Sequence, residues 1–407
     1  MATENNNKTL NVPNLRFPEF SGEWEHVALS EIAARVTRKN KDNASKLPLT
    51  ISAQYGLVDQ ISFFNKVVAS ADMSNYYLLR QGEFAYNKSY SSDYPWGAIK
   101  RLDRYPQGAL SSLYICFAVN DKVDSDFAVH YFESSKWHRE VSNIAGEGAR
   151  NHGLLNIAVG DFFDTKHRLP SSKEEQKKIA ALLNLITERI ATQIKIIEDL
   201  KKLKSAISNK LFARKDLLEK QITISEIGTL KNGYAFQSST YNPAGNHQII
   251  TIANVSGERY IDVDSCNCIM RIPDDIQVHQ VLKKDDILIS LTGNVGRVSL
   301  CIWGNCLLNQ RVGLLQLKQD VNREYVYQAL SSKRFEQAMI ACGQGAAQMN
   351  IGKGDVEDYT IPYSCNVLNM ELIASTLKTY DLLISVEVDR LRLFYQQKQY
   401  LLAQMFI

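Results

Sequence analysis

The 407-residue sequence contains two copies of one pattern, and this repeat constrains the fold more than any other feature. Short matching motifs occur in the same order in both halves, and the distance between the two copies of a motif stays between 192 and 197 residues. The matches are residues 29–33 with 224–228, 146–149 with 343–346, 156–161 with 350–355, and 169–170 with 361–362. Internal repeats of this kind indicate a duplicated structural unit. We therefore expect two like modules in one chain.

Each half ends in a stretch with the apolar spacing of a coiled coil. Pro170 is followed by Ser172 and Glu175, a capping-box pattern in which both side chains satisfy backbone amides of the first helical turn. The same apolar stripe returns 194 residues later, and its polar interruptions match as well. The stripes are Leu183, Ile186, Ile190, Ile197, Leu200, Ile207 and Leu211, interrupted at Gln193 and Lys204, and Leu377, Tyr380, Ile384, Leu391, Phe394, Leu401 and Met405, interrupted at Glu387 and Lys398. One short stripe would indicate an ordinary core helix, but two matched stripes of about 40 residues, against an average helix of ~11–12, favour long helices that pack on each other.

The position of the stripes in the chain predicts how the parts are connected. A 40-residue helix is about 60 Å long, so the first module lies at its start and the second at its end. If the two stripes bury each other, the second helix runs back, which gives an antiparallel pair with a pseudo-twofold axis. We expect an α+β fold of two similar α/β modules, residues 1–167 and 216–360, separated by two long helices, residues 168–215 and 361–407, packed as an antiparallel coiled coil.

Within the modules, the pattern predicts short strands with a helical piece late in each module. The strands are expected at residues 76–79, 84–86 and 109–119, and at 248–252, 286–292, 298–302 and 306–317. The helical pieces are expected at residues 126–144 and 323–341, each just before a Gly-x-Gly loop.

The loops between these strands carry the residue types that nucleic-acid-binding proteins use. Arginine can pair with guanine and Asn or Gln with adenine, whereas lysines and backbone amides contact phosphate. The candidates are Lys88, Ser89, Tyr90, Ser91, Tyr94, Trp96, Lys100 and Arg101 in the first module, Thr292, Asn294, Arg297, Gln310 and Arg311 in the second, and Arg150, Asn151 and Gln348 beside the Gly-x-Gly loops. The alternative interpretation of each is an exposed turn residue on a solvated loop.

Composition limits the location and the partners of the chain. The net charge is only +3, from 47 basic and 44 acidic residues, so DNA affinity must come from local patches or from partners. Seven scattered cysteines suggest reduced thiols. The polar N-terminus does not resemble a secretory signal, and the sequence contains no apolar run of the ~18–20 residues that a membrane span needs. We expect a cytoplasmic protein.

A catalytic or metal site is not predicted. Residues 93–96 are similar to the Asp-Pro-Pro-Tyr/Trp motif of adenine methyltransferases, but the first proline is missing. Neither Cys266 with Cys268 nor Cys301 with Cys306 has zinc-knuckle spacing, and buried apolar roles fit these cysteines better. His130, His138 and His152 could meet in space, but a histidine is more often simply hydrogen bonded.

The assembled pattern resembles the specificity (S) subunit of type I restriction-modification systems over essentially the full length. The resemblance is strongest at Leu169-Pro170, residues 175–180 and Leu211-Phe212, which are similar to the conserved helix of the family. Ile361-Pro362, Ile373-Ala374 and Met405-Phe406 repeat this helix, although Asn369-Met370-Glu371 departs from the first copy. Residues 284–290 with 293–297 are similar to a segment of the family's second recognition domain, and residues 13–20 with Trp24 to its usual start.

This resemblance implies a DNA-binding protein without catalytic activity of its own. Each module would be a target-recognition domain that reads one half of a bipartite double-stranded DNA site, and the helices would set the gap between the halves. The resemblance also implies that the helices bind two methyltransferase subunits, which carry S-adenosylmethionine, and that restriction subunits join the complex. A coiled-coil scaffold whose modules bind protein or carbohydrate is the main alternative. A catalytic methyltransferase or nuclease is a third.

Overall fold

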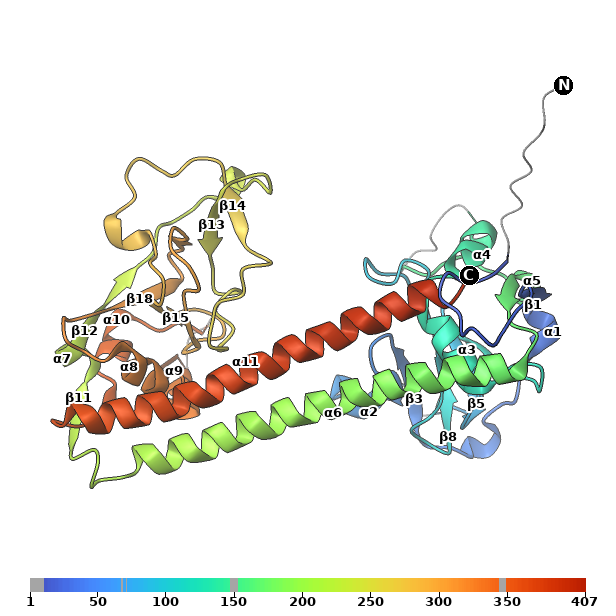
Figure 1. The fold of residues 1–407 in the computed structure, drawn as a ribbon, viewed down its shortest axis with the longest axis horizontal. Coiled ribbons are helices and arrows are strands. Elements are labelled where there is room, and N and C mark those ends of the chain that lie inside the picture. Colours follow the sequence, from blue (N-terminus) through green and yellow to red (C-terminus); the bar gives the residue numbers. More distant parts are fainter. Residues whose placement is uncertain (1–10, 67–68, 71, 147–152, 344–348) are drawn as a thin grey trace. The chain divides into compact units, whose positions relative to one another are not determined.

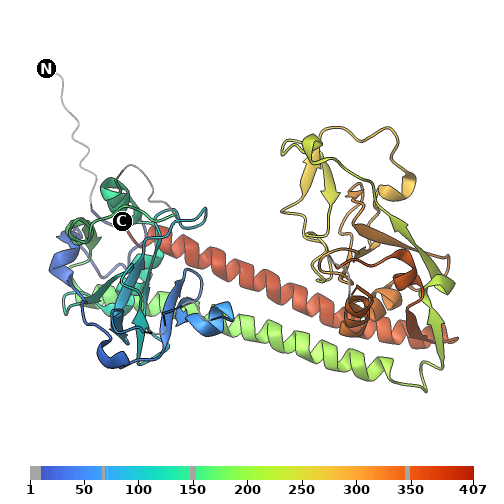
Figure 2. The same ribbon diagram turned by 180° about the vertical axis from the view of Figure 1, so that it is seen from behind.

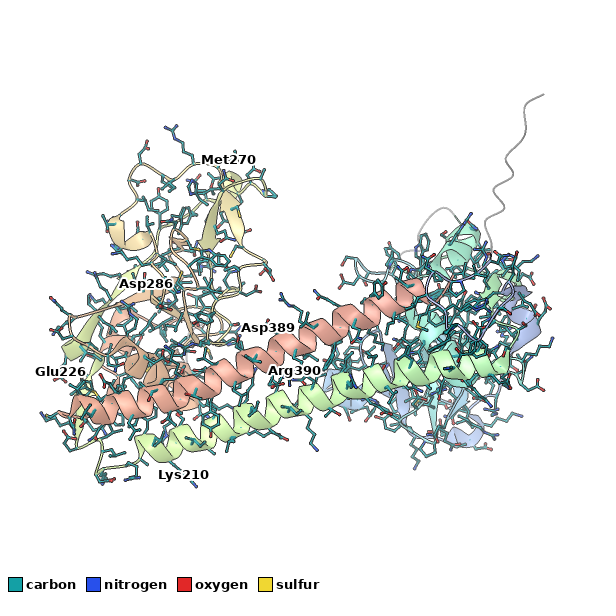
Figure 3. The ribbon with its side chains drawn as sticks, in the orientation of Figure 1. Lys210, Glu226, Met270, Asp286, Asp389 and Arg390 are labelled. Atoms are coloured by element: carbon teal, nitrogen blue, oxygen red, sulfur yellow. The ribbon has the colours of Figure 1, made fainter. Side chains whose placement is uncertain are left out.

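A computed structural model describes residues 11–66, 69–70, 72–146, 153–343 and 349–407. Contacts between residues divide the chain into two units, Met1–Gln193 with Arg390–Ile407 (unit 1) and Ile194–Asp389 (unit 2). Each unit contains one module together with a segment of each long helix. The boundary in the C-terminal helix lies between Asp389 and Arg390, both labelled in Figure 3.

The module of unit 1 combines sheets with short helices (Figure 1). Its elements are β1 (Glu25–Ala28), α1 (Leu29–Ile32), β2 (Ala33–Arg35), the 3-10 helix η1 (Lys41–Asn43), β3 (Pro48–Ser52), β4 (Gly56–Asp59), α2 (Gln60–Phe64), β5 (Tyr77–Arg80), β6 (Phe84–Asn87), β7 (Ala98–Arg101), β8 (Gln107–Leu110), β9 (Ile115–Val119), α3 (Ser125–Glu133), α4 (His138–Ile144), α5 (Val159–Asp164) and β10 (Lys166–Leu169). The sheets have the strand orders β2-β9-β6-β7, β4-β3-β8-β5 and β1-β10.

The module of unit 2 also combines strands with short helices (Figure 2). They are β11 (Lys220–Thr223), α7 (Ile224–Ile227), β12 (Gly228–Asn232), η2 (Ser238–Thr240), β13 (His247–Ile250), β14 (Asn267–Ile269), η3 (Val278–Gln280), β15 (Ile287–Ser290), β16 (Val298–Leu300), β17 (Leu307–Leu308), β18 (Val312–Leu317), α8 (Arg323–Leu330), α9 (Lys333–Gly343), α10 (Lys353–Glu357) and β19 (Thr360–Tyr363). The strand orders are β12-β18-β15-β16, β14-β13-β17 and β11-β19.

The two modules share the topology of their first sheet and of three strands of the second, which confirms the predicted repeat, although β5 of unit 1 has no counterpart in the second sheet of unit 2. The order β2-β9-β6-β7 of unit 1 corresponds strand by strand to β12-β18-β15-β16 of unit 2. In both, one strand of the second sheet pairs antiparallel with the next strand and parallel with a later one, β3 with β4 and β8, and β13 with β14 and β17. The repeated motif at residues 29–33 and 224–228 contains the one-turn helices α1 and α7.

Two predicted strands and two predicted helices are each divided in the structure. Residues 109–119 belong to β8 and β9, and residues 306–317 to β17 and β18, because the chain leaves one sheet there and enters the other. The helical pieces break into α3 and α4 at Ser134, and into α8 and α9 around Ser332. Both serine hydroxyls donate hydrogen bonds to helix carbonyls, Ser134 to Tyr131 O (2.6 Å) and Ser332 to Ala329 O (2.7 Å), which competes with continuation of the helix.

The long helices are α6 (Lys173–Phe212, 40 residues) and α11 (Val367–Gln404, 38 residues). In unit 1, Ile186 and Ile190 of α6 share a core with Leu401 of α11 and with Met405, which follows directly after α11. In unit 2, the late α6 residues Ile207, Leu211 and Phe212 share a core with the early α11 residues Met370, Ile373 and Leu377. In each unit the start of one helix packs with the end of the other, so the helices run antiparallel as predicted.

The apolar stripes face inward along both helices. Every residue of the two predicted stripes is buried or half-buried, whereas Leu185, Leu203, Leu372 and Val386 on other faces are at least 47% exposed.

The start of α6 corrects one prediction. Ser172 Oγ accepts the Glu175 backbone amide (3.3 Å), as expected for a cap. The Glu175 carboxylate, however, does not close a capping box among the described contacts: it accepts Arg16 Nε (2.7 Å), Arg16 Nη2 (2.8 Å) and Trp24 Nε1 (3.3 Å). It is therefore used to attach the N-terminal segment to the helix.

Candidate nucleic-acid interface

The loop between β6 and β7 is held by a second segment of unit 1. Ser89 forms a β-bridge with Leu154. The Tyr90 amide donates to Gly153 O (3.0 Å), and the Leu155 amide donates to Lys88 O (2.9 Å). The loop and the segment that follows the first Gly-x-Gly motif were predicted as separate contributors to DNA binding. The structure brings the described parts of both together.

Aromatic residues attach the far side of this loop to the module core. The Tyr86 hydroxyl donates to Trp96 O (2.8 Å), and the Trp96 side chain packs on the core. Tyr94 is half-buried, and burial, followed by the charges of Asp93 and Glu133, raises its pKa. Ser89, Ser91 and Tyr90, the last 44% exposed, remain open to solvent. Tyr94 and Trp96 therefore support the loop, and the exposed hydroxyl groups are available to a ligand.

Unit 2 repeats this construction. Thr292, two residues after the end of β15, forms a β-bridge with Asn350, and its Oγ1 donates to Asn350 Oδ1 (3.0 Å). The Gly293 amide donates to Met349 O (2.9 Å), and the Ile351 amide donates to Leu291 O (2.9 Å). Because β15 corresponds to β6 in strand order, the same pairing of a loop with a late segment occurs at the same place in both modules.

The β15–β16 turn presents polar groups next to a second turn. Ser290 Oγ donates to Asn294 O and accepts the Arg297 amide (3.0 Å), which fixes the turn and leaves the Asn294 side chain exposed. The Leu291 amide donates to Arg311 O (3.0 Å), so the turn carrying the exposed Gln310 and Arg311 adjoins the one carrying Thr292.

Among the described residues, the Arg297 side chain has one weak ion-pair partner. Its Nε lies 3.7 Å from Glu336 Oε1, and the two side chains are 36% and 39% exposed. Solvent screens such a pair, so the arginine can exchange its carboxylate for a ligand at low cost.

Lys100 and Arg101 have stronger partners inside the protein. Lys100 Nζ lies 3.9 Å from Glu133 Oε1, and burial lowers its pKa. Arg101 is bound to Asp126 (2.8 Å) and Asp103 (2.7 Å). Their role in DNA binding stays a prediction, and the proposal below rests on other residues. Lys88 Nζ donates to Ile157 O (3.4 Å). Arg150, Asn151 and Gln348 lie outside the described residues.

One residue of the unit 2 site, Tyr234, was not predicted. Asn350, which holds Thr292, lies in the segment after the second Gly-x-Gly motif that was predicted as a second contributor. Tyr234 accepts the Gln310 amide through its carbonyl (2.9 Å), and its hydroxyl donates to Asp275 Oδ1 (2.9 Å), which raises the tyrosine pKa. Tyrosine is a common residue at interfaces, but Tyr234 lies far from Gln310 in the sequence, so no local pattern connected the two.

The described residues contain no group of three or more His, Cys, Asp or Glu side chains arranged to hold a metal ion. Cys301 and Cys306 are buried, as expected, and burial raises the pKa of the half-buried Cys266 to about 12. His130 is hydrogen bonded to Asn184 (2.8 Å) and Glu133 (3.3 Å).

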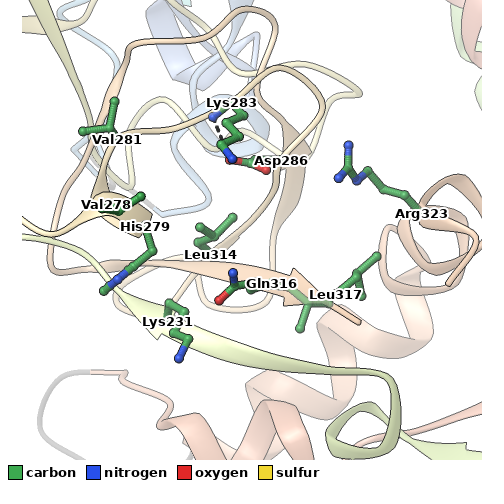
Figure 4. A pocket seen from close by; sticks show the side chains of 11 residues that line it. Lys231, Val278, His279, Val281, Lys283, Asp286, Leu314, Gln316, Leu317 and Arg323 are labelled. Carbon is green, nitrogen blue, oxygen red and sulfur yellow. Dashed lines mark hydrogen bonds between the residues drawn. The ribbon is translucent and has the colours of Figure 1, made fainter. Parts of the chain in front are cut away.

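A polar pocket of about 420 Å³ lies apart from these loops in unit 2. Figure 4 shows Lys231, Lys283 and Arg323 around it with one carboxyl group, that of Asp286. Burial raises the pKa of Asp286. None of the predicted DNA-binding residues lines this pocket.

In the described part of the chain, no helix is long and apolar enough to cross a membrane.

Comparisons with known proteins agree with this architecture. The family model of the type I restriction modification DNA specificity domain matches residues 219–392. A chain from a structure on complex assembly and conformational transition of the type I R-M system is similar at 17% identity, with a TM-score of 0.57 over 95% of this chain and 98% of that one. The S subunit of a type I restriction-modification system from M. genitalium is similar at 16% identity, with a TM-score of 0.54 over 97% and 99%. At these identities the two structures establish the fold. Comparison with curated proteins gave no match.

Proposed function

We propose that this chain, whose residues 219–392 match the family model of the type I restriction modification DNA specificity domain, is the sequence-recognition subunit of such a system. Each module reads one half of a bipartite double-stranded DNA target. The observation that carries the proposal is the paired loop and late segment, Ser89 with Leu154 and Thr292 with Asn350, built at equivalent places in both modules.

The chemistry of the exposed groups suits base reading. Asn294, Gln310 and Arg311 offer paired hydrogen bonds to the edges of adenine and guanine in the major groove. Ser89, Tyr90 and Ser91 offer hydroxyl groups to bases or phosphates. Because backbone hydrogen bonds hold these loops in place, little conformational freedom is lost on binding.

The remaining parts of the complex are proposed on the same basis. Two methyltransferase subunits bind the long helices and carry S-adenosylmethionine, restriction subunits join them, and this chain contributes no catalytic group. The unit 2 part of α11 supports such docking, because Leu368, Leu372 and Val386 are 70%, 55% and 55% exposed. A role on cellular DNA places the complex in the cytoplasm.

The proposal is tested with the chain purified together with its methyltransferase subunits. Genome-wide mapping of methylated adenines gives the target, and a gel-shift assay then measures retention of that duplex against scrambled competitors. Selective retention is expected. A complex that retains all duplexes equally, but binds a protein or a glycan, would favour the scaffold alternative, and S-adenosylmethionine bound by the isolated chain would favour a catalytic one.

A substitution at Arg297 tests whether this loop contributes to base recognition. Arg297→Ala is expected to weaken discrimination in one half-site by about 1–3 kcal/mol, with the other half-site unchanged. Glu336→Ala, which removes only the internal partner of Arg297 (3.7 Å), is the matched control and is expected to preserve the reading. An Arg297→Ala complex with unaltered discrimination in both halves would contradict this assignment.

A further inference from the structure

Two of the polar residues that interrupt the apolar stripes form ion pairs in the structure. Lys204 of α6 and Lys398 of α11 lie 194 residues apart in sequence, at matching positions of the stripes. Lys204 Nζ lies 2.6 Å from Asp381 Oδ1, and Lys398 Nζ lies 2.8 Å from Glu133 Oε2. The lysine side chains are only 18% and 14% exposed. Each lysine therefore makes a largely buried ion pair in its own unit.

In unit 1 the ion pair is part of a network that joins the module helix α3 to both long helices. Glu133 of α3 contacts Lys398 of α11 and also His130 (3.3 Å), and His130 contacts Asn184 of α6 (2.8 Å). Asn184 Nδ2 donates to Asp126 Oδ2 (3.4 Å), which also binds Arg101 (2.8 Å). Burial alone would raise the pKa of Glu133, but the hydrogen bond to His130 and the charges of Lys398 and Lys100 lower it to about 2.

In unit 2 the corresponding network joins α8 to both long helices. Asp381 of α11 accepts Lys204 of α6, Arg259 Nη1 (3.2 Å) and Gln328 Nε2 (2.6 Å). Arg259 also forms a two-point pair with Glu324 of α8 (2.7 and 2.8 Å). The side chains of Arg259 and Asp381 are each 8% exposed.

The two networks use equivalent positions of the repeat. The N-cap residues of α3 and α8 are Asp124 and Asn322. Two positions after the cap stand the acids Asp126 and Glu324, and six positions after it stand His130 and Gln328. The acceptor of the long-helix lysine differs, Glu133 on the module helix in unit 1 and Asp381 on α11 in unit 2. Both copies of the repeat thus have a lysine at the same position, but the acidic partner of that lysine comes from a different helix in each unit.

Stability alone does not explain the largely buried ion pairs of Lys204 and Lys398. Replacing a buried ion pair by well-packed apolar residues is often neutral or stabilising, because both charges must be desolvated. A polar residue within an apolar helix seam instead selects one register, since a shift leaves it unpaired. One turn of slip moves a side chain by about 5.4 Å, more than these contacts tolerate.

From this arrangement we infer that Lys204 and Lys398 are positioning residues, which fix the register of the helix pair against each recognition module and so restrict DNA reading to one gap length. The inference rests on the proposed function. It concerns the gap only, because neither lysine belongs to the loops that read bases.

The test uses the full complex on duplexes whose mapped target has its natural gap or a gap one base pair longer or shorter. Lys204→Met and Lys398→Met are expected to lower the preference for the natural gap by roughly tenfold, the size of one lost specific contact. Discrimination within each half-site stays as in the wild type. Lys204→Arg and Lys398→Arg keep the charge and are expected to restore the preference.

A matched control separates this role from a general effect of losing a charge. Lys202→Met removes a lysine from the same helix whose side chain is 74% exposed, and the gap preference is expected to stay unchanged. If a Met variant does not assemble, Lys→Gln at the same position is compared with Lys→Arg.

Each outcome has a distinct meaning. A wild-type complex that selects no DNA sequence defeats the proposed function itself. A wild-type complex that selects its target, together with Met or Gln variants that keep the full gap preference, overturns this inference alone. Loss of preference in the Arg variants as well would show that packing, and not the charge, sets the register.

Discussion

Glu175 illustrates how one buried carboxylate joins distant segments. It is 1% exposed and accepts hydrogen bonds from Arg16 and Trp24. In Glu175→Ala the partly buried Arg16 keeps its hydrogen bonds to the carbonyls of Ser21 and Gly22 but loses its carboxylate partner, so we expect the free energy of unfolding to fall by roughly 2–4 kcal/mol. Chemical denaturation measures the change. Glu174→Ala, at the exposed neighbouring position, is the control and is expected to have little effect. A loss of only about 1 kcal/mol would match a simple helix cap instead.

His167 on β10 gives unit 1 a defined sensitivity to acid. The Thr165 hydroxyl donates to Phe162 O (2.6 Å), so it accepts from His167 Nε2 (2.9 Å), and His167 Nδ1 accepts from the Tyr131 hydroxyl (2.8 Å). The bond that Nδ1 accepts requires a neutral ring. Burial, and to a smaller extent the charge of His26, lowers the pKa of His167 to about 4 from an ordinary 6.5.

The pH dependence follows from that lowered pKa. Between pH 6.5 and 4 the unfolded chain binds a proton that the folded chain does not, so the contribution of His167 is full above pH 6.5 and is lost as the pH falls to 4. The loss is ~3 kcal/mol. His167→Asn is expected to flatten the slope of unfolding free energy against pH in this window, measured by urea denaturation. His26→Asn, at an exposed position of β1, removes only the smaller contribution and is expected to keep most of the slope. Equal slopes in wild type and His167→Asn would refute the assignment.

The conformation of the β6–β7 loop depends on one glycine. Gly97 has φ +77°, and a Cβ there would collide with the carbonyl oxygen of Asn87. Gly97→Ala is therefore expected to cost roughly 2–4 kcal/mol of unfolding free energy and to weaken reading of one half-site. Gly82→Ala tests conformation alone, because Gly82 has φ +84° but open space around it, and about 1 kcal/mol is expected. Calorimetry and half-site competition give the two readouts. Similar losses in both variants would exclude the collision.

The sequence predicted some elements better than others for physical reasons. The long helices were predictable because Leu183 to Leu211 repeat one spacing over many turns, which a short strand never does. The division of residues 109–119 was not, because Ser111 and Ser112 interrupt the apolar run only briefly, and the move of the chain from β3 and β5 to β2 and β6 depends on tertiary pairing.

The candidate site was predictable only in part. Loop composition made Thr292 and Asn294 candidates, but nothing local indicated that Thr292 is held by Asn350, 58 residues away. Likewise, Lys100 and Arg101 have the composition of a DNA contact, and only the structure shows the carboxylates of Glu133 and Asp126 beside them. Pairings between distant segments depend on the fold and are not encoded in a short window.

The two copies of the repeat keep a similar order of elements but differ in individual side-chain contacts. Gln176 of α6 is buried and donates to Pro170 O (2.9 Å), whereas the equivalent Met370 of α11 packs in the apolar core. The same position is thus satisfied by a hydrogen bond in one copy and by packing in the other. Two modules that diverge in this way can read different sequences, which an asymmetric bipartite target requires.

The proposed role of the helices as the gap-setting element is testable by changing their length. Removing residues 194–200 from α6 alone shifts Lys204 by one heptad, about 10 Å, away from Asp381, and assembly is expected to fail. Removing residues 385–391 of α11 as well restores the register of the shortened pair. At ~1.5 Å per helical residue and ~3.4 Å per base pair, the doubly shortened complex is expected to methylate the same half-sites with a gap about three base pairs shorter. Methylation mapping reads this out directly. If that complex assembles and keeps the original gap, the spacing is set by the partner subunits and not by the helices of this chain.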